Sequence, residues 1–217
     1  MKKVIVGNSG VIVSDGKAHY IDVLPDGYTR LQYISMSGKS AVDTGIVVAQ
    51  ADTILVTYEL SDLTKTGDKF ICSCKAGYSG GGIWFETYGN TNKWYVRFGS
   101  ASSVNVNNDT FVSGKHTGEL KKGSFKIDGT TVLSPTYSSM PSTTLNIGGR
   151  IQTDGVSVVG MYGSLYEAKI LDGNGEPRWW GVPVKNSNNV PGFYDMVGDQ
   201  FHPSVSSSNP FTAGPEA

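Results

Sequence analysis

Polar and apolar residues alternate one by one along much of this chain, and this period of two most constrains its fold. In residues 53–60 every second residue is apolar, and in residues 93–98 Trp94, Val96 and Phe98 alternate with Lys93, Tyr95 and Arg97. Such alternation is typical of half-buried β-strands. No segment keeps the 3.6-residue period of an amphipathic helix.

The rest of the chain repeats this pattern in short runs separated by turn residues. Further strands are predicted at 4–6, 11–14, 19–23, 31–35, 69–74, 83–88, 103–107, 116–121, 124–127, 131–133, 143–148, 156–159, 163–171 and 178–184. Asp-Gly pairs, which supply the positive φ angles of tight hairpins, stand at 15–16, 26–27, 128–129, 154–155 and 172–173. Many short strands with Gly-rich turns predict an all-β, antiparallel sandwich or barrel.

Charge and hydropathy exclude several classes of function. The 217 residues hold 18 Lys+Arg against 19 Asp+Glu, so the net charge is −1, whereas a nucleic-acid-binding surface needs a basic excess. No stretch approaches the roughly 18 apolar residues of a membrane span. The start has two lysines and then three apolar residues, shorter than the about 7–15 of a signal peptide. We therefore expect synthesis in a cytoplasm, no membrane insertion and no nucleic-acid partner.

The two ends differ from the middle. Residues 1–24 predict a β-hairpin extension, with strands Lys3–Val6 and Val11–Ser14, and a lone hairpin must pack on its own domain or on another subunit. Its candidate anchoring residues are Val4, Ile5, Val6, Val11, Ile12 and Val13. Pro25-Asp26-Gly27 marks a boundary, and residues 25–217 form the main domain. Residues 186–217 are rich in Asn, Ser, Pro and Gly but keep several large apolar residues, so we expect an ordered, irregular strap over the sandwich.

The cysteines and histidines give no catalytic or metal pattern. Cys72 and Cys74 lie two apart on one predicted strand face, where a disulfide would distort the backbone, so both are expected to be reduced and buried. The three histidines, His19, His116 and His202, have no metal-spaced neighbour. Neither cysteine has a histidine nearby in the sequence, so the sequence does not support catalysis by a cysteine nucleophile.

Three segments resemble the laminin-G-like, concanavalin-A-like jelly roll. Residues 124–132 resemble its strand–Asp-Gly–strand hairpin, residues 144–149 (TLNIGG) its "L-x-I-G-G" strand end, and residues 163–171 its late strand. The order and spacing match. The resemblance implies an antiparallel two-sheet β-sandwich of the concanavalin-A-like kind, here carrying the N-terminal β-hairpin extension.

A second resemblance covers residues 24–217. The opening LPDGYTRLQYI at 24–34, followed by AVDTG at 41–45, is similar to a recurrent opening of bacteriophage and prophage proteins of gut bacteria. VPVK at 182–185, VPGFYDMV at 190–197 and FTAGP at 211–215 are similar to their C-terminal ends. That family commonly has an aromatic-Asn or similar polar pair after Tyr-Asp-x-Val, and here residues 198–202 (GDQFH) stand in its place.

This resemblance implies a bacteriophage virion structural protein without enzymatic activity, in a capsid decoration, a fibre or a tail surface. Its expected partners are other virion proteins and further copies of itself in a homo-oligomer, with cell-surface glycans as a third class. The expected location is the virion, after synthesis in the bacterial host cytoplasm. The alternatives are a soluble or surface carbohydrate-binding module and a glycoside hydrolase.

One region has the chemistry of a glycan site, which pairs an aromatic platform with hydrogen-bonding groups. The candidate contacts are Trp84, Glu86, Tyr88, Asn92, Tyr95 and Arg97. Glu86, between aromatics, could serve as a general acid, orient a sugar hydroxyl or be a solvated surface residue, and Trp84 and Trp94 could simply pack. A glycosidase needs two carboxylates about 5–9 Å apart, and no Glu-x-Asp-x-x-Glu pattern occurs, so we expect no catalytic residue.

Calcium is the one cofactor that the loops leave open. Oxygen-rich loops stand at 105–109, 152–154 and 172–174. Calcium takes six to eight oxygens, usually with two or more carboxylates, and the carboxylates here are spread thinly among the loops. The sequence therefore predicts no required cofactor, with a structural calcium ion as the open alternative.

Overall fold

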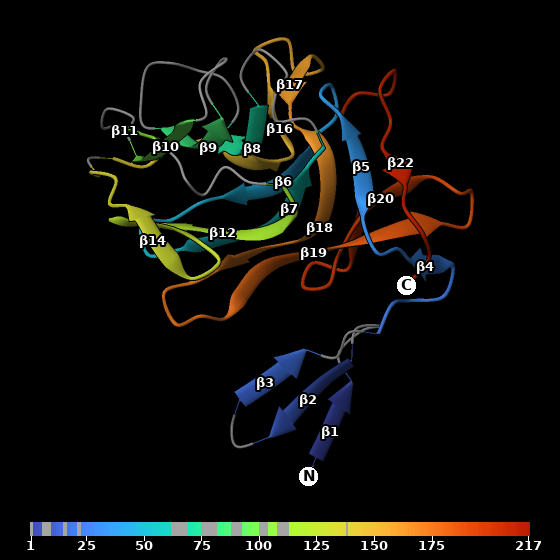
Figure 1. Cartoon of the computed structure of the whole chain (residues 1–217). Helices are drawn as coiled ribbons and strands as arrows, with labels where there is room; N and C mark the ends of the chain where they lie inside the picture. Colours follow the sequence, from blue (N-terminus) through green and yellow to red (C-terminus); the bar gives the residue numbers. More distant parts are fainter. Residues whose placement is uncertain are drawn as a thin grey trace.

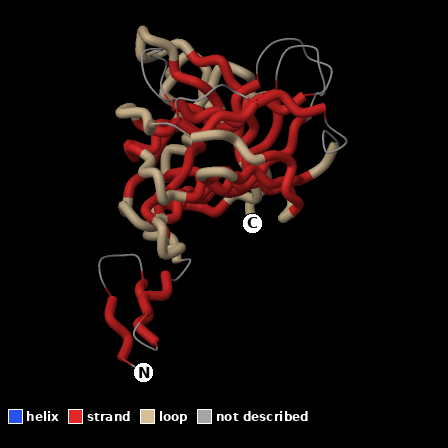
Figure 2. Tube along the Cα trace, turned by 90° about the vertical axis from the view of Figure 1, so that its left-hand side faces the viewer, coloured by secondary structure: helices blue, strands red, loops and turns tan. Residues whose placement is uncertain are grey.

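The computed structural model is an assembly of antiparallel strands (Figure 1). It describes residues 2–5, 10–14, 17–20, 23–61, 69–74, 82–87, 93–99, 104–107, 113–137 and 139–217. Over these ranges the chain forms only strands and loops (Figure 2), and so it contains no helix able to cross a membrane. The predicted all-β class is confirmed.

The larger of the two main sheets has eleven strands. Its main path runs through β14 (Thr130–Leu133), β13 (Ser124–Ile127), β12 (Lys115–Lys121), β7 (Thr53–Leu60), β18 (Tyr162–Leu171), β19 (Pro177–Asn186), β20 (Pro191–Asp195) and β21 (Gln200–Pro203). Beside this path, β4 (Tyr28–Arg30) pairs with β19, β5 (Ile34–Ser37) pairs with β18, and β22 (Thr212–Ala213) pairs with β5.

The smaller main sheet has six strands. Their order is β11 (Val104–Asn107), β10 (Lys93–Gly99), β9 (Gly82–Thr87), β8 (Lys69–Cys74), β15 (Thr144–Ile147) and β6 (Val42–Val47). The short pair β16 (Gly149–Ile151) and β17 (Val158–Gly160) follows β15 and lies beside β8. Because β11 lies near β14 and β6 near β21, the two main sheets meet along both sides.

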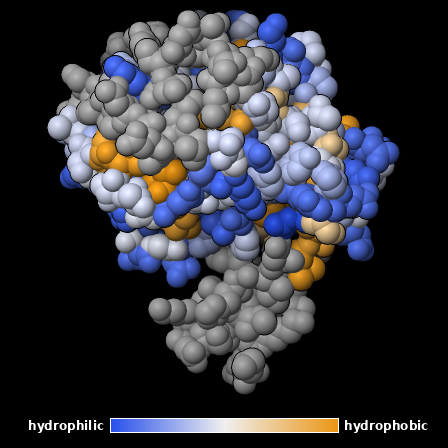
Figure 3. All heavy atoms as spheres, in the orientation of Figure 1, coloured by the Kyte–Doolittle hydropathy of each residue, from blue (hydrophilic) through white to orange (hydrophobic). Residues whose placement is uncertain are grey.

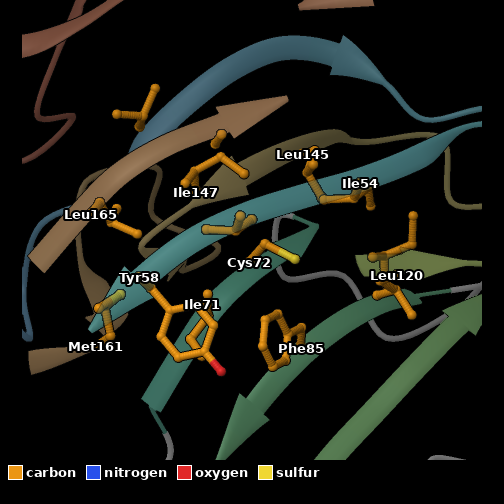
Figure 4. Close-up of a cluster of buried hydrophobic side chains, with 14 of the residues drawn as sticks. Ile54, Tyr58, Ile71, Cys72, Phe85, Leu120, Leu145, Ile147, Met161 and Leu165 are labelled. Atoms are coloured by element: carbon orange, nitrogen blue, oxygen red, sulfur yellow. The ribbon is translucent and has the colours of Figure 1, made fainter. Parts of the chain in front are cut away.

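The main hydrophobic core fills the space between these two sheets (Figure 4). Phe85 of β9 contacts Tyr58 of β7 and Phe125 of β13, with ring centroids 5.4 and 4.8 Å away. Phe85 also lies against Gly118 of β12, where a Cβ would fall 2.4 Å from its ring. In residues 53–60 and 93–98, the alternating apolar side chains, which the sequence predicts to share one face, are buried in this core. Two antiparallel sheets packed face to face form a β-sandwich.

The predicted hairpin at residues 124–133 is confirmed, and its turn shows how sequence sets the local fold. Asp128 and Gly129 have φ angles of 49° and 78°, the left-handed conformations that a tight two-residue hairpin turn requires. The Asp128 carboxylate accepts a hydrogen bond from Thr117 N at 2.8 Å and contacts His116 Nδ1 at 2.7 Å. The turn is thereby tied to β12.

A second apolar cluster lies on the other face of the large sheet. Val182, Val184, Tyr194 and Met196 are buried there, with Trp180 packed against them, while Trp179 is fully buried in the main core. The adjacent tryptophans thus point to opposite faces, as alternation in a strand requires. The neighbouring Asp195 accepts hydrogen bonds from Trp180 N and Val197 N, both at 3.0 Å, and so caps the turn after β20.

The C-terminal segment corrects one expectation. Residues 186–217 are ordered, but they are not an irregular strap, because β20 and β21 extend the large sheet and β22 pairs with β5. The apolar alternation of β20 and β21 is interrupted by Pro191, Gly192 and Pro203, so the period of two cannot be recognised in the sequence. Their pairing with β19 and with each other is unbroken in register nonetheless.

The N-terminal strands form a three-stranded sheet of their own, β1 (Lys2–Ile5), β2 (Gly10–Ser14) and β3 (Lys17–Tyr20). The predicted hairpin is present, with Val4 opposite Val11 and Lys3 opposite Ile12, and β3 adds a strand to the other edge of β2. Of the candidate anchoring residues, Val4, Ile5, Val11, Ile12 and Val13 lie in these strands, and Val6 lies outside the described residues. Their anchoring role stays a prediction.

Candidate functional site: a polar row on the outer face of the six-stranded sheet

One row of polar and aromatic residues crosses five neighbouring strands of the six-stranded sheet. Asp43 of β6 is directly opposite Asn146 of β15, Asn146 is opposite Ser73 of β8, Ser73 is opposite Trp84 of β9, and Trp84 is opposite Arg97 of β10. Residues opposite each other in an antiparallel pair share a face. Each member alternates with core residues of its strand, so the row lies on the face that points away from the core. We call these five residues the polar row.

A second line of residues runs beside the polar row. Phe70 of β8 is opposite Glu86, and Glu86 is opposite Tyr95. The Arg150 guanidinium lies 4.5 Å from the centre of the Phe70 ring, a cation–π contact. The face therefore combines aromatic rings, two carboxylates, an amide, a hydroxyl and guanidinium groups.

The accessible end of this face lies on β9 and β10. The Arg97 guanidinium lies over the Trp84 indole at 4.0 Å from the ring centre, so each holds the other in place. Trp84, Tyr95 and Arg97 are all half-buried, and each keeps part of its side chain in contact with solvent. An aromatic ring next to hydrogen-bond donors is the combination that a sugar ring requires.

The middle of the face is buried. Ser73 and Asn146 are fully buried, and Ser73 Oγ donates a hydrogen bond to Gly149 O at 3.2 Å. Neither amide atom of Asn146 has a hydrogen-bond partner in the described part of the chain. Leaving a buried polar group unpaired costs about 1–3 kcal/mol, so Asn146 lowers the stability of the fold at this position.

Glu86 corrects one of the interpretations left open for it. Only 4% of Glu86 is exposed, so it is not a solvated surface residue. Alternation assigned Glu86 correctly to the face of Trp84, but alternation carries no information on what covers that face. The alternative for Trp84 and Trp94 was packing in the core or between subunits. Trp94 is in the main core and Trp84 is not, so core packing holds for Trp94, and packing of Trp84 between subunits stays a prediction.

The structure brings together four of the six candidate glycan contacts: Trp84, Glu86, Tyr95 and Arg97. Tyr88 and Asn92 lie outside the described residues. Three members of the polar row, Asp43, Ser73 and Asn146, were not among the candidates. Each lies in a strand of only four to six residues, and only the pairing of distant strands places them in one row with Trp84.

Two of the three oxygen-rich loops, at 152–154 and 172–174, use their carboxylates internally, and Asp109 of the third lies outside the described residues. Asp172 Oδ1 accepts hydrogen bonds from Asn174 N and Glu176 N at 2.8 and 2.9 Å, and these bonds hold the pKa of this exposed carboxyl below its usual value. Asp154 accepts comparable bonds from its own turn. The described residues contain no cluster of three or more His, Cys, Asp or Glu side chains that could hold a metal ion.

The cysteine prediction is confirmed. Cys72 and Cys74 are free and buried in the main core. Burial raises the pKa of both thiols, that of Cys74 to about 12, so neither is a ready nucleophile.

His202 is a packed histidine, half-buried, with its ring 6.0 Å from that of Trp179. Burial lowers its pKa below the usual 6.5, and the nearby Asp195 and Asp43 oppose this shift only in part.

Comparison with known proteins gives no family for this chain. It matches no protein-family model and no curated protein sequence.

Proposed function

We propose that this protein is a non-enzymatic display domain of a bacteriophage particle that adheres to cell-surface glycans through the accessible end of the outer face, on β9 and β10. The observation that carries the adhesion role is the cross-strand grouping of Trp84, Tyr95 and Arg97 beside Glu86. The virion location rests on the resemblance of residues 24–45 and 182–215 to phage and prophage proteins. We further propose that the sandwich is a concanavalin-A-like jelly roll.

The chemistry of the face favours binding over catalysis. Among the described strands of this face, Glu86 and Asp43 carry the carboxylates, and three strand spacings separate β9 from β6. That separation is about 14 Å, beyond the roughly 5–9.5 Å that glycoside hydrolysis requires. Sugar recognition needs only the aromatic surface and the hydrogen-bonding groups.

A glycan microarray probed with the purified full chain tests the adhesion role. We expect saturable binding to a subset of glycans and no release of reducing sugar from any of them. The absence of binding to every glycan would refute adhesion. Turnover of a glycan that disappears in Glu86→Gln would instead identify a glycoside hydrolase, since in a binding protein the same substitution changes affinity only modestly.

Electron microscopy of purified phage particles with an antibody to this chain tests the virion role. Labelling at regular capsid positions supports decoration, with residues 1–24 as the anchor and a homo-oligomer as the expected form. Labelling at the fibre or tail tip supports host recognition. Unlabelled particles would overturn the virion role and favour the alternative of a soluble or surface carbohydrate-binding module.

A further inference from the structure

A separate polar hollow lies between the C-terminal segment and the turn that joins β16 to β17. Its volume is about 530 Å³, within the roughly 300–1,000 Å³ of small-molecule sites. It is lined by Lys39, Val156–Val158 and Val205–Asn209. None of these residues belongs to the polar row, so the hollow is a distinct feature of the molecule.

One wall of the hollow is a serine-rich loop held by its own hydrogen bonds. Ser204 Oγ donates to Asn209 O at 3.0 Å, and Asn209 Nδ2 donates to Ser206 Oγ at 3.1 Å. Val205 N donates to Ala41 O at 3.0 Å and fastens the loop beside β6. The hydroxyl groups of this wall are thus positioned before any ligand arrives, which reduces the entropy lost on binding.

The opposite wall is held in a similar way by Asp154. Its carboxylate accepts hydrogen bonds from Val156 N at 3.0 Å, from Ser157 N at 2.8 Å and from Ser157 Oγ. These bonds fix the turn and hold Val156 at its tip, where 61% of this large apolar side chain is exposed. An apolar side chain on a fixed turn offers a contact for the carbon face of a sugar.

Lys39 supplies the charge of the hollow. It is the only ionisable residue among the described residues that line it, and it is exposed. Within the described part of the chain Lys39 forms no ion pair, whereas other lysines pair with carboxylates, as Lys169 does with Glu167 at 3.1 Å. Its ammonium therefore has no compensating carboxylate among the described residues.

We propose that this hollow binds an acidic sugar residue. The sugar carboxylate contacts Lys39 and the serine hydroxyls, the ring hydroxyls bond to Asn209 and Ser207, and the carbon face lies against Val156. A neutral sugar leaves Lys39 without a counter-charge, so the hollow discriminates by charge. This inference rests on the proposed glycan adhesion, but it assigns the acidic sugar to residues outside the polar row.

NMR titration of the full chain with the methyl glycoside of N-acetylneuraminic acid tests this site. We expect shifts of the backbone amides of residues 156–158 and 205–209, and much weaker shifts with methyl glucoside. Lys39→Met should weaken binding about tenfold or more, because a hydrogen bond to a charged group is lost. Lys122→Met, a change of the same charge elsewhere on the surface, should leave the affinity unchanged.

Two further variants keep the two sites apart. Ser207→Ala should weaken acidic-sugar binding severalfold, and Arg97→Ala should leave it intact. Three outcomes would each overturn the acidic-sugar site. They are amide shifts confined to residues around Arg97, equal affinity for the two glycosides, and an affinity of Lys39→Met equal to that of the wild type. A chain that binds acidic sugar here but no glycan through Arg97 would refute only the adhesion role of the polar row.

Discussion

A single methyl group added at Gly118 should destabilise the protein, because the two sheets approach closely at this position. The Cβ of an alanine there would fall 2.4 Å from Phe85 Cε1 and 2.8 Å from Phe85 Cζ, on the facing sheet. Such overpacking of a core costs about 1–3 kcal/mol. Gly118 is not among the glycines with positive φ, so the backbone itself accepts an alanine.

The same substitution should have the opposite effect once the Phe85 ring is gone. Phe85→Leu removes the two ring atoms that would lie closest to the new methyl group, at 2.4 and 2.8 Å. Alanine in a strand is then more stable than glycine by about 0.5–1 kcal/mol. We therefore expect a coupling free energy of about 1.5 kcal/mol or more between Gly118→Ala and Phe85→Leu.

Urea unfolding of the wild type, the two single variants and the double variant measures this coupling. The dependence of the unfolding free energy on urea should stay the same in all four proteins, since a change would indicate an altered native or unfolded state. Additive effects, within about 0.5 kcal/mol, would refute the close approach of the two sheets at Gly118.

Three further predictions concern buried groups. Asn146→Leu should raise the free energy of unfolding by about 1 kcal/mol or more, because it removes a buried, unpaired amide; a loss of stability in urea unfolding would contradict this. The lowered pKa of His202 means that the unfolded chain binds a proton more readily below pH 6.5, so stability should fall as pH drops from about 6.5 towards 5. His202→Phe should flatten this part of the stability profile, and an unchanged profile would assign it to other groups. Cys72 and Cys74 should react with a thiol reagent at pH 8 only after unfolding, and rapid reaction of the native protein would show that the core opens.

Alternation along the chain predicted the strands whose inner face is large and apolar. Residues 53–60 match β7 without any shift of its ends, and the Asp128-Gly129 turn has the predicted left-handed conformation. These features depend on local sequence alone, since the period of side chains and the φ angles of a turn are properties of neighbouring residues.

Features set by distant pairing were not predictable in the same way. The polar row exists because β15 lies between β6 and β8, which brings Asn146 beside Ser73, 73 positions earlier in the chain. The burial of Glu86 likewise depends on what covers its face. The strands β20 and β21 were missed because proline and glycine break their alternation, although their backbones pair fully.

The most direct test of the central proposal is the affinity of the strongest neutral glycan from the microarray for variants of the accessible end of this outer face, on β9 and β10. Isothermal titration calorimetry should show a loss of about tenfold or more for Arg97→Ala and for Tyr95→Ala, because each removes a contact group from this face. Lys126→Ala, on the other sheet, serves as the control and should bind like the wild type. Equal affinities for all four proteins would contradict the assignment of glycan adhesion to this face.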